Sequence, residues 1–201
     1  MLDTVVMYDN IHFSTATNGL SGVLREHKAH EIVTILHRAL ARAELNAPAA
    51  ARGAFIGVGA EFDALQAMGK VLREATKNLL FIDAYMDEKV LTDFAPLAPE
   101  GVVIWVFGDS SSSKVASLRP AAERWVKQYG ATRPLEVRLS APRALHDRLV
   151  VVDAGTRVWN LSQSLNHFVA RSPASIVRFD ADVAAMKRDH YLSLWGGATL
   201  L

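Results

Sequence analysis

The chain has 201 residues, of which 50% are hydrophobic and 21% are charged, a composition that excludes a disordered tail or a collagen-like chain. It contains no cysteine, which excludes disulfides, thiolate metal sites and cysteine nucleophiles. With 22 Lys and Arg against 21 Asp and Glu, the formal net charge is only +1, so overall charge nominates neither nucleic acid nor an anionic membrane as a partner.

The first 53 residues are expected to form an N-terminal helical extension. Residues 1–22 are weakly patterned and are interpreted as irregular or as a short peripheral piece, whereas residues 31–43 repeat apolar side chains at helical spacing and predict a helix. Pro48 and several alanines indicate a linker over residues 46–53. The start of the chain lacks the basic region and apolar core of a signal peptide, and no apolar run approaches the ~18 residues of a membrane span. We therefore expect a soluble cytoplasmic protein.

Residues 54–201 alternate between strand and helix patterns. Near-continuous runs of Val, Ile and Leu indicate strands that are covered on both faces, and Ala154-Gly155 is a plausible hairpin turn. The fold class is therefore predicted to be α/β, a mixed sheet flanked by helices, in a second domain of residues 54–201. Strands are predicted at residues 54–58, 78–83, 102–107, 135–139, 148–152, 157–161 and 175–179. Helices are predicted at residues 61–77, 118–130 (entered through Pro120) and 181–195.

Basic side chains are concentrated in one segment. Residues 114–148 contain eight basic and three acidic side chains, a net charge of +5, and the segment includes His146. One interpretation is a positive approach to an anionic substrate, because focused fields raise the local concentration of anions. The other is a solvated helix and loop face.

Polar residues with a regular spacing follow this segment. His146 and Arg148 are two residues apart, so in an extended strand their side chains point to the same face. Ser164 and Asn166 have the same spacing. The full pattern is His-x-Arg, four residues, Asp153, and then Gln-Ser-x-Asn.

This pattern resembles the signature of the phospholipase D superfamily, which is His-x-Lys, four residues and Asp, followed by Gly-Ser-x-Asn. The resemblance covers residues 54–201 and implies a mixed sheet flanked by helices. More narrowly, the stretch is similar to bacterial phospholipase D-like proteins of unassigned role that carry His-Asp-Arg here.

The resemblance implies a role for each matched residue. His146 matches the nucleophile that forms a phospho-histidine intermediate, and Arg148 matches the lysine that binds the phosphoryl oxygens. Asp153 matches the family aspartate, often a structural or orienting partner, within the predicted catalytic set. Ser164 and Asn166 match the residues that support the histidine and the phosphate.

Two departures bear on these roles. Arginine replaces the motif lysine at Arg148 and binds phosphate as a fork rather than as a point charge. Gln163 replaces the motif glycine and places a side chain where it could crowd the pocket.

The function implied by the resemblance is a metal-independent phosphodiesterase that needs no cofactor. The family mechanism uses two motifs, and this chain has one, so we expect a homodimer in which His146 of each subunit meets at the two-fold axis. Nucleic acid is favoured over lipid as the phosphodiester substrate because of the basic segment and the absence of an amphipathic membrane-binding stretch. The alternative is a non-catalytic module that binds phosphate, in nucleic acid or in phospholipid headgroups.

Further candidates follow two predicted strands. Asp83 and Tyr85 follow the strand predicted at residues 78–83, and strand ends in open α/β sheets border ligand crevices, so both are candidate substrate-binding residues. The four serines at residues 110–113 form either a flexible loop or a cradle for phosphate.

Overall fold

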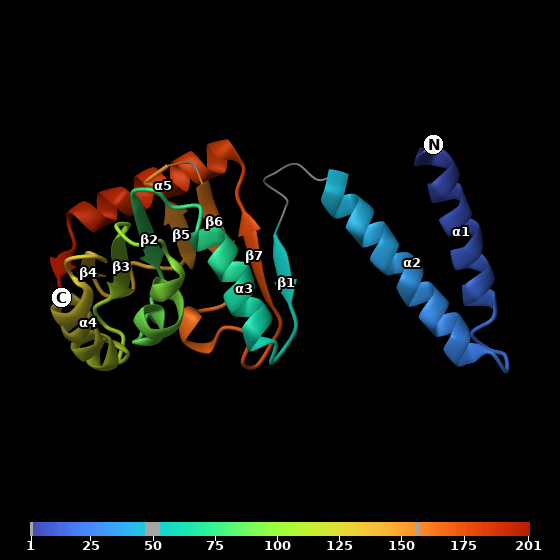
Figure 1. Ribbon diagram of the computed structural model, residues 1–201, viewed down its shortest axis with the longest axis horizontal. Helices are drawn as coiled ribbons and strands as arrows, with labels where there is room; N and C mark the ends of the chain where they lie inside the picture. Colours follow the sequence, from blue (N-terminus) through green and yellow to red (C-terminus); the bar gives the residue numbers. More distant parts are fainter. Residues whose placement is uncertain (1, 47–52, 156) are drawn as a thin grey trace. The chain divides into compact units, whose positions relative to one another are not determined.

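The computed structural model describes residues 2–46, 53–155 and 157–201 (Figure 1). The chain divides into two compact units, Met1–Pro48 and Ala49–Leu201, whereas the sequence predicted the division after residue 53. Most of the predicted linker, residues 47–52, lies outside the described residues. No helix in the described ranges has the length and apolarity needed to cross a membrane.

The first unit contains two helices, α1 (Leu2–Asn18) and α2 (Arg25–Asn46). The expectation that residues 1–22 are irregular is therefore wrong over α1. Pairs between the helices, Arg38 with Asp9 at 3.4 Å and His12 with Glu31 at 3.4 Å, connect residues that are far apart in sequence. Contacts with another helix are not visible as an apolar repeat within α1. The helix was therefore missed when the sequence was searched for helical periodicity.

The second unit is built on one eight-stranded mixed sheet, in the order β1-β7-β6-β5-β2-β3-β4-β8. The pairs β2–β3 and β3–β4 are parallel and the other neighbours are antiparallel. The predicted α/β class and mixed sheet are confirmed, although β8 was not predicted. The strands are β1 (Ala54–Ile56), β2 (Asn78–Ile82), β3 (Val103–Asp109), β4 (Leu135–Ser140), β5 (Leu149–Val152), β6 (Arg157–Leu161), β7 (Ala174–Arg178) and β8 (Thr199–Leu200).

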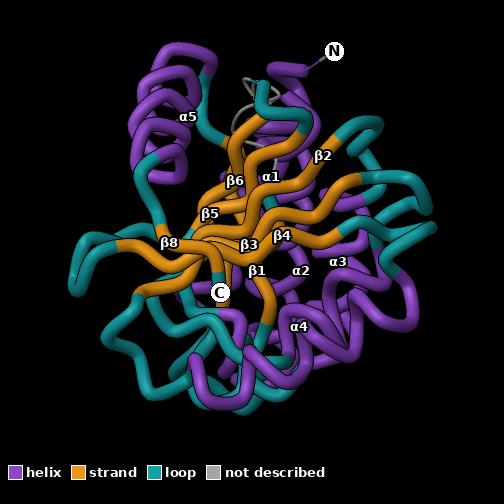
Figure 2. Tube along the Cα trace, turned by 90° about the vertical axis from the view of Figure 1, so that its left-hand side faces the viewer, coloured by secondary structure: helices purple, strands orange, loops and turns teal. Residues whose placement is uncertain are grey.

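Helices cover both faces of the sheet (Figure 2). On one face lie α3 (Glu61–Leu72), α4 (Val115–Tyr129) and the short helical turns η2 (Val90–Phe94) and η3 (Ala95–Leu97), and on the other lies α5 (Ala181–Gly196). The two turns were not predicted.

The helix predicted at residues 31–43 is longer, Arg25–Asn46, and two predicted helix boundaries in the second unit were also wrong. The helix predicted to reach residue 77 ends at Leu72, because the backbone N–H groups of Thr76 and Lys77 bind Asp153 instead of helix carbonyls. The helix predicted to begin at residue 118 begins at Val115, so Pro120 lies inside α4 rather than in its first turn.

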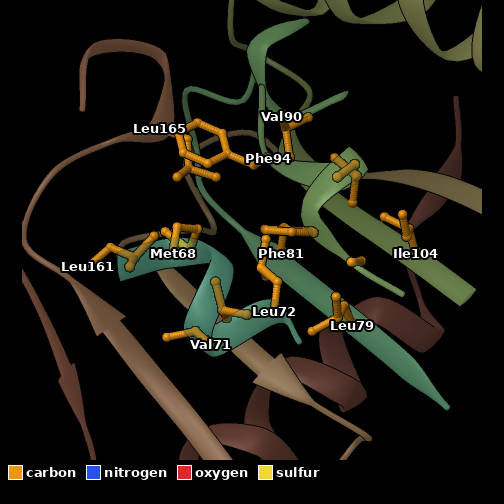
Figure 3. Close-up of a cluster of buried hydrophobic side chains, with 14 of the residues drawn as sticks. Met68, Val71, Leu72, Leu79, Phe81, Val90, Phe94, Ile104, Leu161 and Leu165 are labelled. Atoms are coloured by element: carbon orange, nitrogen blue, oxygen red, sulfur yellow. The ribbon is translucent and has the colours of Figure 1, made fainter. Parts of the chain in front are cut away.

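The central strands are buried on both faces, as their apolar runs predicted. Figure 3 shows Leu79 and Phe81 of β2 beside Met68 and Leu72 of α3, in the cluster on that face. Alternate residues of the same strands point the other way and pack with Tyr191 and Trp195 of α5. The rigid centre of the sheet therefore positions whatever follows the ends of β2 and β5.

Asp153, directly after β5, joins three segments of the second unit. Its Oδ1 accepts hydrogen bonds from the backbone N–H groups of Thr76 (2.9 Å), Lys77 (2.7 Å) and Asn78 (3.2 Å), and its Oδ2 accepts from Arg157 Nη2 at 2.6 Å. Burial opposes ionisation of Asp153, but these backbone donors and the Thr76 hydroxyl outweigh it and lower its pKa to about 2. The carboxylate holds the start of β2 against the β5–β6 turn.

We expect Asp153→Asn to lower the free energy of unfolding by about 2 kcal/mol at neutral pH, from the lowered pKa. An acid whose folded pKa is depressed stabilises the protein above its unfolded pKa. The difference between wild type and variant should therefore be full above pH 3.8 and shrink towards pH 2. Urea unfolding followed by tryptophan fluorescence measures it.

Asp189→Asn, which removes an exposed acid paired with Arg188, is the matched control and should change stability by less than about 0.5 kcal/mol. Equal effects of the two variants would show that the Asp153 hydrogen bonds do not stabilise the fold.

Candidate functional site

The predicted site residues gather at one edge of the sheet, with the exception of Asp153. Ile82, near the end of β2, pairs with Phe107 of β3 and with Leu149 at the start of β5. Leu149 in turn pairs with Asn160 near the end of β6. The loops that follow β2, β3 and β6 and the loop that precedes β5 therefore meet at this edge.

Asp83 ties two of these loops together. It has no exposed surface, and its Oδ2 accepts from Ser164 Oγ at 2.5 Å and from the Leu165 backbone N–H at 2.9 Å. Its Oδ1 accepts from the Tyr85 backbone N–H at 2.9 Å. Three donors compensate the removal of the carboxylate from water, so Asp83 fixes Ser164 at the end of β2.

The loop that carries Ser164 is also held from its other side. Leu165 is buried in the cluster of Figure 3, where it lies beside Phe94. Gln163 Nε2 donates to the carbonyl oxygens of Ser172 and Pro173, both at 2.7 Å, and its Oε1 accepts from the Val169 backbone N–H at 3.2 Å. The Gln163 side chain thus braces its own loop.

Val169 sits in the left-handed region at φ 58°, a rare conformation for a β-branched residue. The hydrogen bond from its N–H to Gln163 and the one its carbonyl accepts from the Gly59 N–H at 2.8 Å hold it there. The glutamine that departs from the family motif therefore has a structural partner at this strained position.

The motif loop before β5 is anchored to α5 through Asp147. The Asp147 carboxylate accepts from Lys187 Nζ at 2.5 Å and from the Tyr191 hydroxyl at 2.9 Å. Burial, together with the hydrogen bond to Asp147, raises the pKa of Tyr191 to about 12, so the phenol remains a donor at neutral pH. In extended chain, neighbours on either side of Asp147 point away from α5, which directs His146 and Arg148 to the opposite side.

Arg148 lies next to Asp83. One step beyond the pair of Ile82 with Leu149, the register places Arg148 opposite Asp83, and its carbonyl accepts from the Leu161 N–H at 2.8 Å. The side chain is half-buried, and its Nε is buried with no hydrogen-bond partner. Within the described ranges, no ion pair engages its guanidinium. A half-buried cation with an unused donor suits an anionic ligand.

His146 is exposed and lines a cavity of about 550 Å³ at this edge. The cavity wall combines apolar surface with hydroxyl groups and two further basic side chains. Its lining consists of Ala84, Tyr85, Asp109, Ser111, Ser112, Ser113, Lys114, Arg143, Leu145 and His146.

Asp109 is an acidic residue in the wall of this cavity. It is 3% exposed, and its Oδ1 accepts from the Ser111 N–H at 2.9 Å and from the Ser111 hydroxyl at 2.6 Å. Burial opposes its ionisation, but hydrogen bonds, first among them those from Ser111, outweigh burial and lower the pKa of Asp109. Its Oδ1 therefore orders the loop after β3, whereas its Oδ2 is buried without a hydrogen-bond partner among the described residues.

The basic segment divides into structural and cavity-lining side chains. Arg133 donates to the Ala98 carbonyl at 2.8 Å, and Arg138 pairs with Glu136 at 2.6 Å, so both serve the fold. Lys114 and Arg143 line the cavity of His146 instead. A count of charges could not distinguish these roles.

The structure brings some predicted site residues together and separates others. Ser164 is bonded to Asp83, while Tyr85 and His146 line one cavity. Asn166 is 5% exposed in the short turn η4 (Leu165–His167), next to Ser164 in the chain. Asp153 lies beyond the far end of β5, a strand roughly 10 Å long, and its hydrogen bonds go to the fold rather than to His146.

Asp109 and Asp147 were not named as site residues from the sequence, whereas Lys114 and Arg143 were named only as members of the basic segment. Asp109 could have been predicted, because it stands at the end of a buried strand, as Asp83 does. Asp147 could also have been predicted, since it stands between the two motif residues and must point away from them.

No family model and no curated protein matches the chain. Among solved structures, it is similar to NucT from Helicobacter pylori, with a TM-score of 0.53, 12% identity, and 74% of this chain and 98% of that chain covered. It is also similar to Nuc from Salmonella typhimurium, a phospholipase D family member, with a TM-score of 0.54, 13% identity and the same coverage of 74% and 98%. The fold implied by the sequence resemblance is thereby confirmed: the chain has the phospholipase D superfamily fold.

Proposed function

We propose that the chain is a metal-independent phosphodiesterase in which His146 forms a phospho-histidine intermediate. The observations that support this most directly are an exposed imidazole in the wall of the cavity and, two residues further along the chain, the guanidinium of Arg148, whose buried Nε has no hydrogen-bond partner in the described residues. A phosphodiester is negatively charged, so it would give the Arg148 guanidinium the anionic partner that it lacks among the described residues. The structural neighbour Nuc, described as a phospholipase D family member, is consistent with this chemistry.

The reaction proceeds in two displacements. A ring nitrogen of His146 attacks phosphorus, a P–N bond forms, and the P–O bond to the leaving group breaks as that oxygen receives a proton. Water then attacks the same phosphorus, the P–N bond breaks, and the phosphomonoester leaves. Arg148 neutralises the non-bridging oxygens in both steps.

Asp83 and Ser164 act as positioning residues in this scheme. Because the Ser164 hydroxyl donates its proton to Asp83, its oxygen is left as an acceptor. An acceptor there suits an N–H donor, such as the imidazole of His146 or the guanidinium of Arg148. Asn166 is proposed to support the phosphate, and Asp153 to act only through the fold.

The leaving group needs an acid, and we propose that His146 of a second subunit supplies it. A symmetric homodimer places two copies of one motif around a two-fold axis, so one imidazole attacks while the other donates a proton. Nucleic acid is the proposed substrate, because Lys114 and Arg143 add positive charge to the cavity that His146 lines.

A non-catalytic phosphate-binding module is the second candidate. The observation that favours it is the arginine at Arg148, which binds phosphate bidentately but differs in shape and charge distribution from the family lysine. The two candidates differ in whether a covalent adduct forms on His146.

His146→Ala is expected to reduce hydrolysis of bis(p-nitrophenyl) phosphate in EDTA by at least about a hundredfold, because the nucleophile is removed. Release of nitrophenol measures the rate. Intact-mass spectrometry after an alkaline quench should detect the phosphoryl adduct on wild type and not on the variant. His167→Ala, an exposed histidine in η4, is the control and should retain activity. Absence of both turnover and adduct in wild type would favour the binding module.

Asp83→Asn is expected to destabilise the fold by about 1–3 kcal/mol, since the amide has one acceptor oxygen where the carboxylate has two and leaves a buried donor unsatisfied. Urea unfolding measures this loss, with Asp189→Asn as the surface control. If Asp83 also positions the nucleophile, the pH profile of hydrolysis should change. An unchanged profile with lower stability would restrict Asp83 to a structural role.

The dimer is tested by mixing subunits. Excess His146→Ala protein should inhibit wild type after subunit exchange, because a mixed dimer has only one imidazole. Sedimentation of wild type should give the mass of two chains. A fully active monomer, unaffected by the variant, would contradict the shared site.

A further inference from the structure

Two loops contribute basic side chains to the cavity that His146 lines. They are the loop between β3 and α4 and the loop before β5. Lys114 comes from the first loop and Arg143 from the second. At about 550 Å³ the cavity lies within the roughly 300–1,000 Å³ range of small-molecule sites. It therefore has room for more than the single phosphate that His146 and Arg148 need.

The two cations are available for a ligand. In the described structure neither the Lys114 ammonium nor the Arg143 guanidinium makes a hydrogen bond or an ion pair. The carboxyl groups of Asp87 and Glu88 interact with Lys114 through its charge alone, without a hydrogen bond. Asp109, the acid in the cavity wall, is already hydrogen-bonded to Ser111.

Arg143 is held in an unusual backbone conformation, with φ 61°. A non-glycine residue rarely adopts the left-handed region, and such strain persists where the surroundings impose it. Here the Ala144 N–H donates to the Ala141 carbonyl at 3.2 Å, which closes a tight turn around Arg143. The position of Arg143 in the cavity wall is therefore fixed by the fold.

Arg148 does not line this cavity. Cations thus occupy two separate places, Arg148 directly before β5 and the pair of Lys114 and Arg143 in the cavity, and His146 lines that cavity two residues before Arg148 in the chain. We infer that the cavity binds the phosphate adjacent to the scissile one in a nucleic-acid strand, with Lys114 and Arg143 as its ligands. This inference rests on the proposed function, which places the scissile phosphate at His146.

The rest of the lining fits a nucleotide better than a lipid. Ser111, Ser112 and Ser113 offer hydroxyl groups, and Tyr85 is 54% exposed in the wall, where its ring can stack on a base. Ala84 and Leu145 add aliphatic surface to the lining, against which the sugar or base of a nucleotide can pack.

The test measures binding rather than turnover. The 201-residue His146→Ala chain is titrated in EDTA with the dinucleotide dTpdT and with its two phosphorylated derivatives, isomers of each other that carry a terminal phosphate at the 5′ or the 3′ end. One isomer should bind at least about tenfold more tightly than dTpdT, because it adds charge-assisted contacts to two cations. If neither isomer binds more tightly, the inference is wrong.

Two double variants identify the ligands of the added phosphate. Lys114→Gln with Arg143→Gln should abolish the advantage of the phosphorylated isomer. Arg119→Gln with Lys127→Gln removes the same charge from exposed residues of α4 that line a different cavity, and should preserve it. An advantage that survives the first pair, or is lost equally in both, would overturn the assignment.

Two further outcomes separate the inference from its premises. Binding of cardiolipin–phosphatidylcholine vesicles, with no preference for a phosphorylated dinucleotide, would assign the second phosphate to a lipid and overturn the choice of nucleic acid. A phosphate advantage that depends on Lys114 and Arg143, in a protein whose wild type does not hydrolyse bis(p-nitrophenyl) phosphate, would support the subsite while the proposed catalysis fails.

Discussion

The site depends on the hydrogen bonds that the buried carboxylate of Asp83 accepts. An ionised group without exposed surface is tolerated only where hydrogen bonds replace water, and Asp83 receives them from Ser164, Leu165 and Tyr85. These donors come from two loops that are far apart in sequence. The carboxylate therefore converts the end of one central strand into the point from which the neighbouring loops are aligned.

The motif loop before β5 adds a second constraint, which is the alternation of side chains from Leu145 to Arg148. Leu145 and Asp147 face α5, the first by packing and the second through Lys187 and Tyr191. Because period-two geometry leaves His146 and Arg148 the opposite side, the anchoring of Asp147 orients both. The imidazole and the guanidinium are thus directed by a residue that takes no part in the proposed chemistry.

Much of this could be predicted from the sequence, because it depends on local patterns. Apolar runs predicted the central strands, and the two-residue spacing predicted that His146 and Arg148 share a face. Asp83 was found because it ends a strand. In each case the signal lies within a few residues of chain.

The remainder depends on contacts between distant segments. Asp153 matched the family motif next to His146 in sequence, yet four intervening strand residues carry it to the other end of β5, where Thr76 and Lys77 occupy it. Lys114 and Arg143 lay in a basic segment with two open interpretations, a positive approach to a substrate or a solvated face, and only the fold places both in one cavity. The helix α1 was missed because its pairs, such as Asp9 with Arg38, cross to another helix.

The separation between Asp83 and its donors, 81 residues for Ser164 and 82 for Leu165, has a consequence for biosynthesis. Contacts of such long range close late, after the loop entropy between them has been overcome. During translation the acid emerges well before its hydroxyl partner. A nascent or truncated chain that stops short of β6 and its following loop lacks Ser164 and Leu165, so it cannot assemble the candidate site.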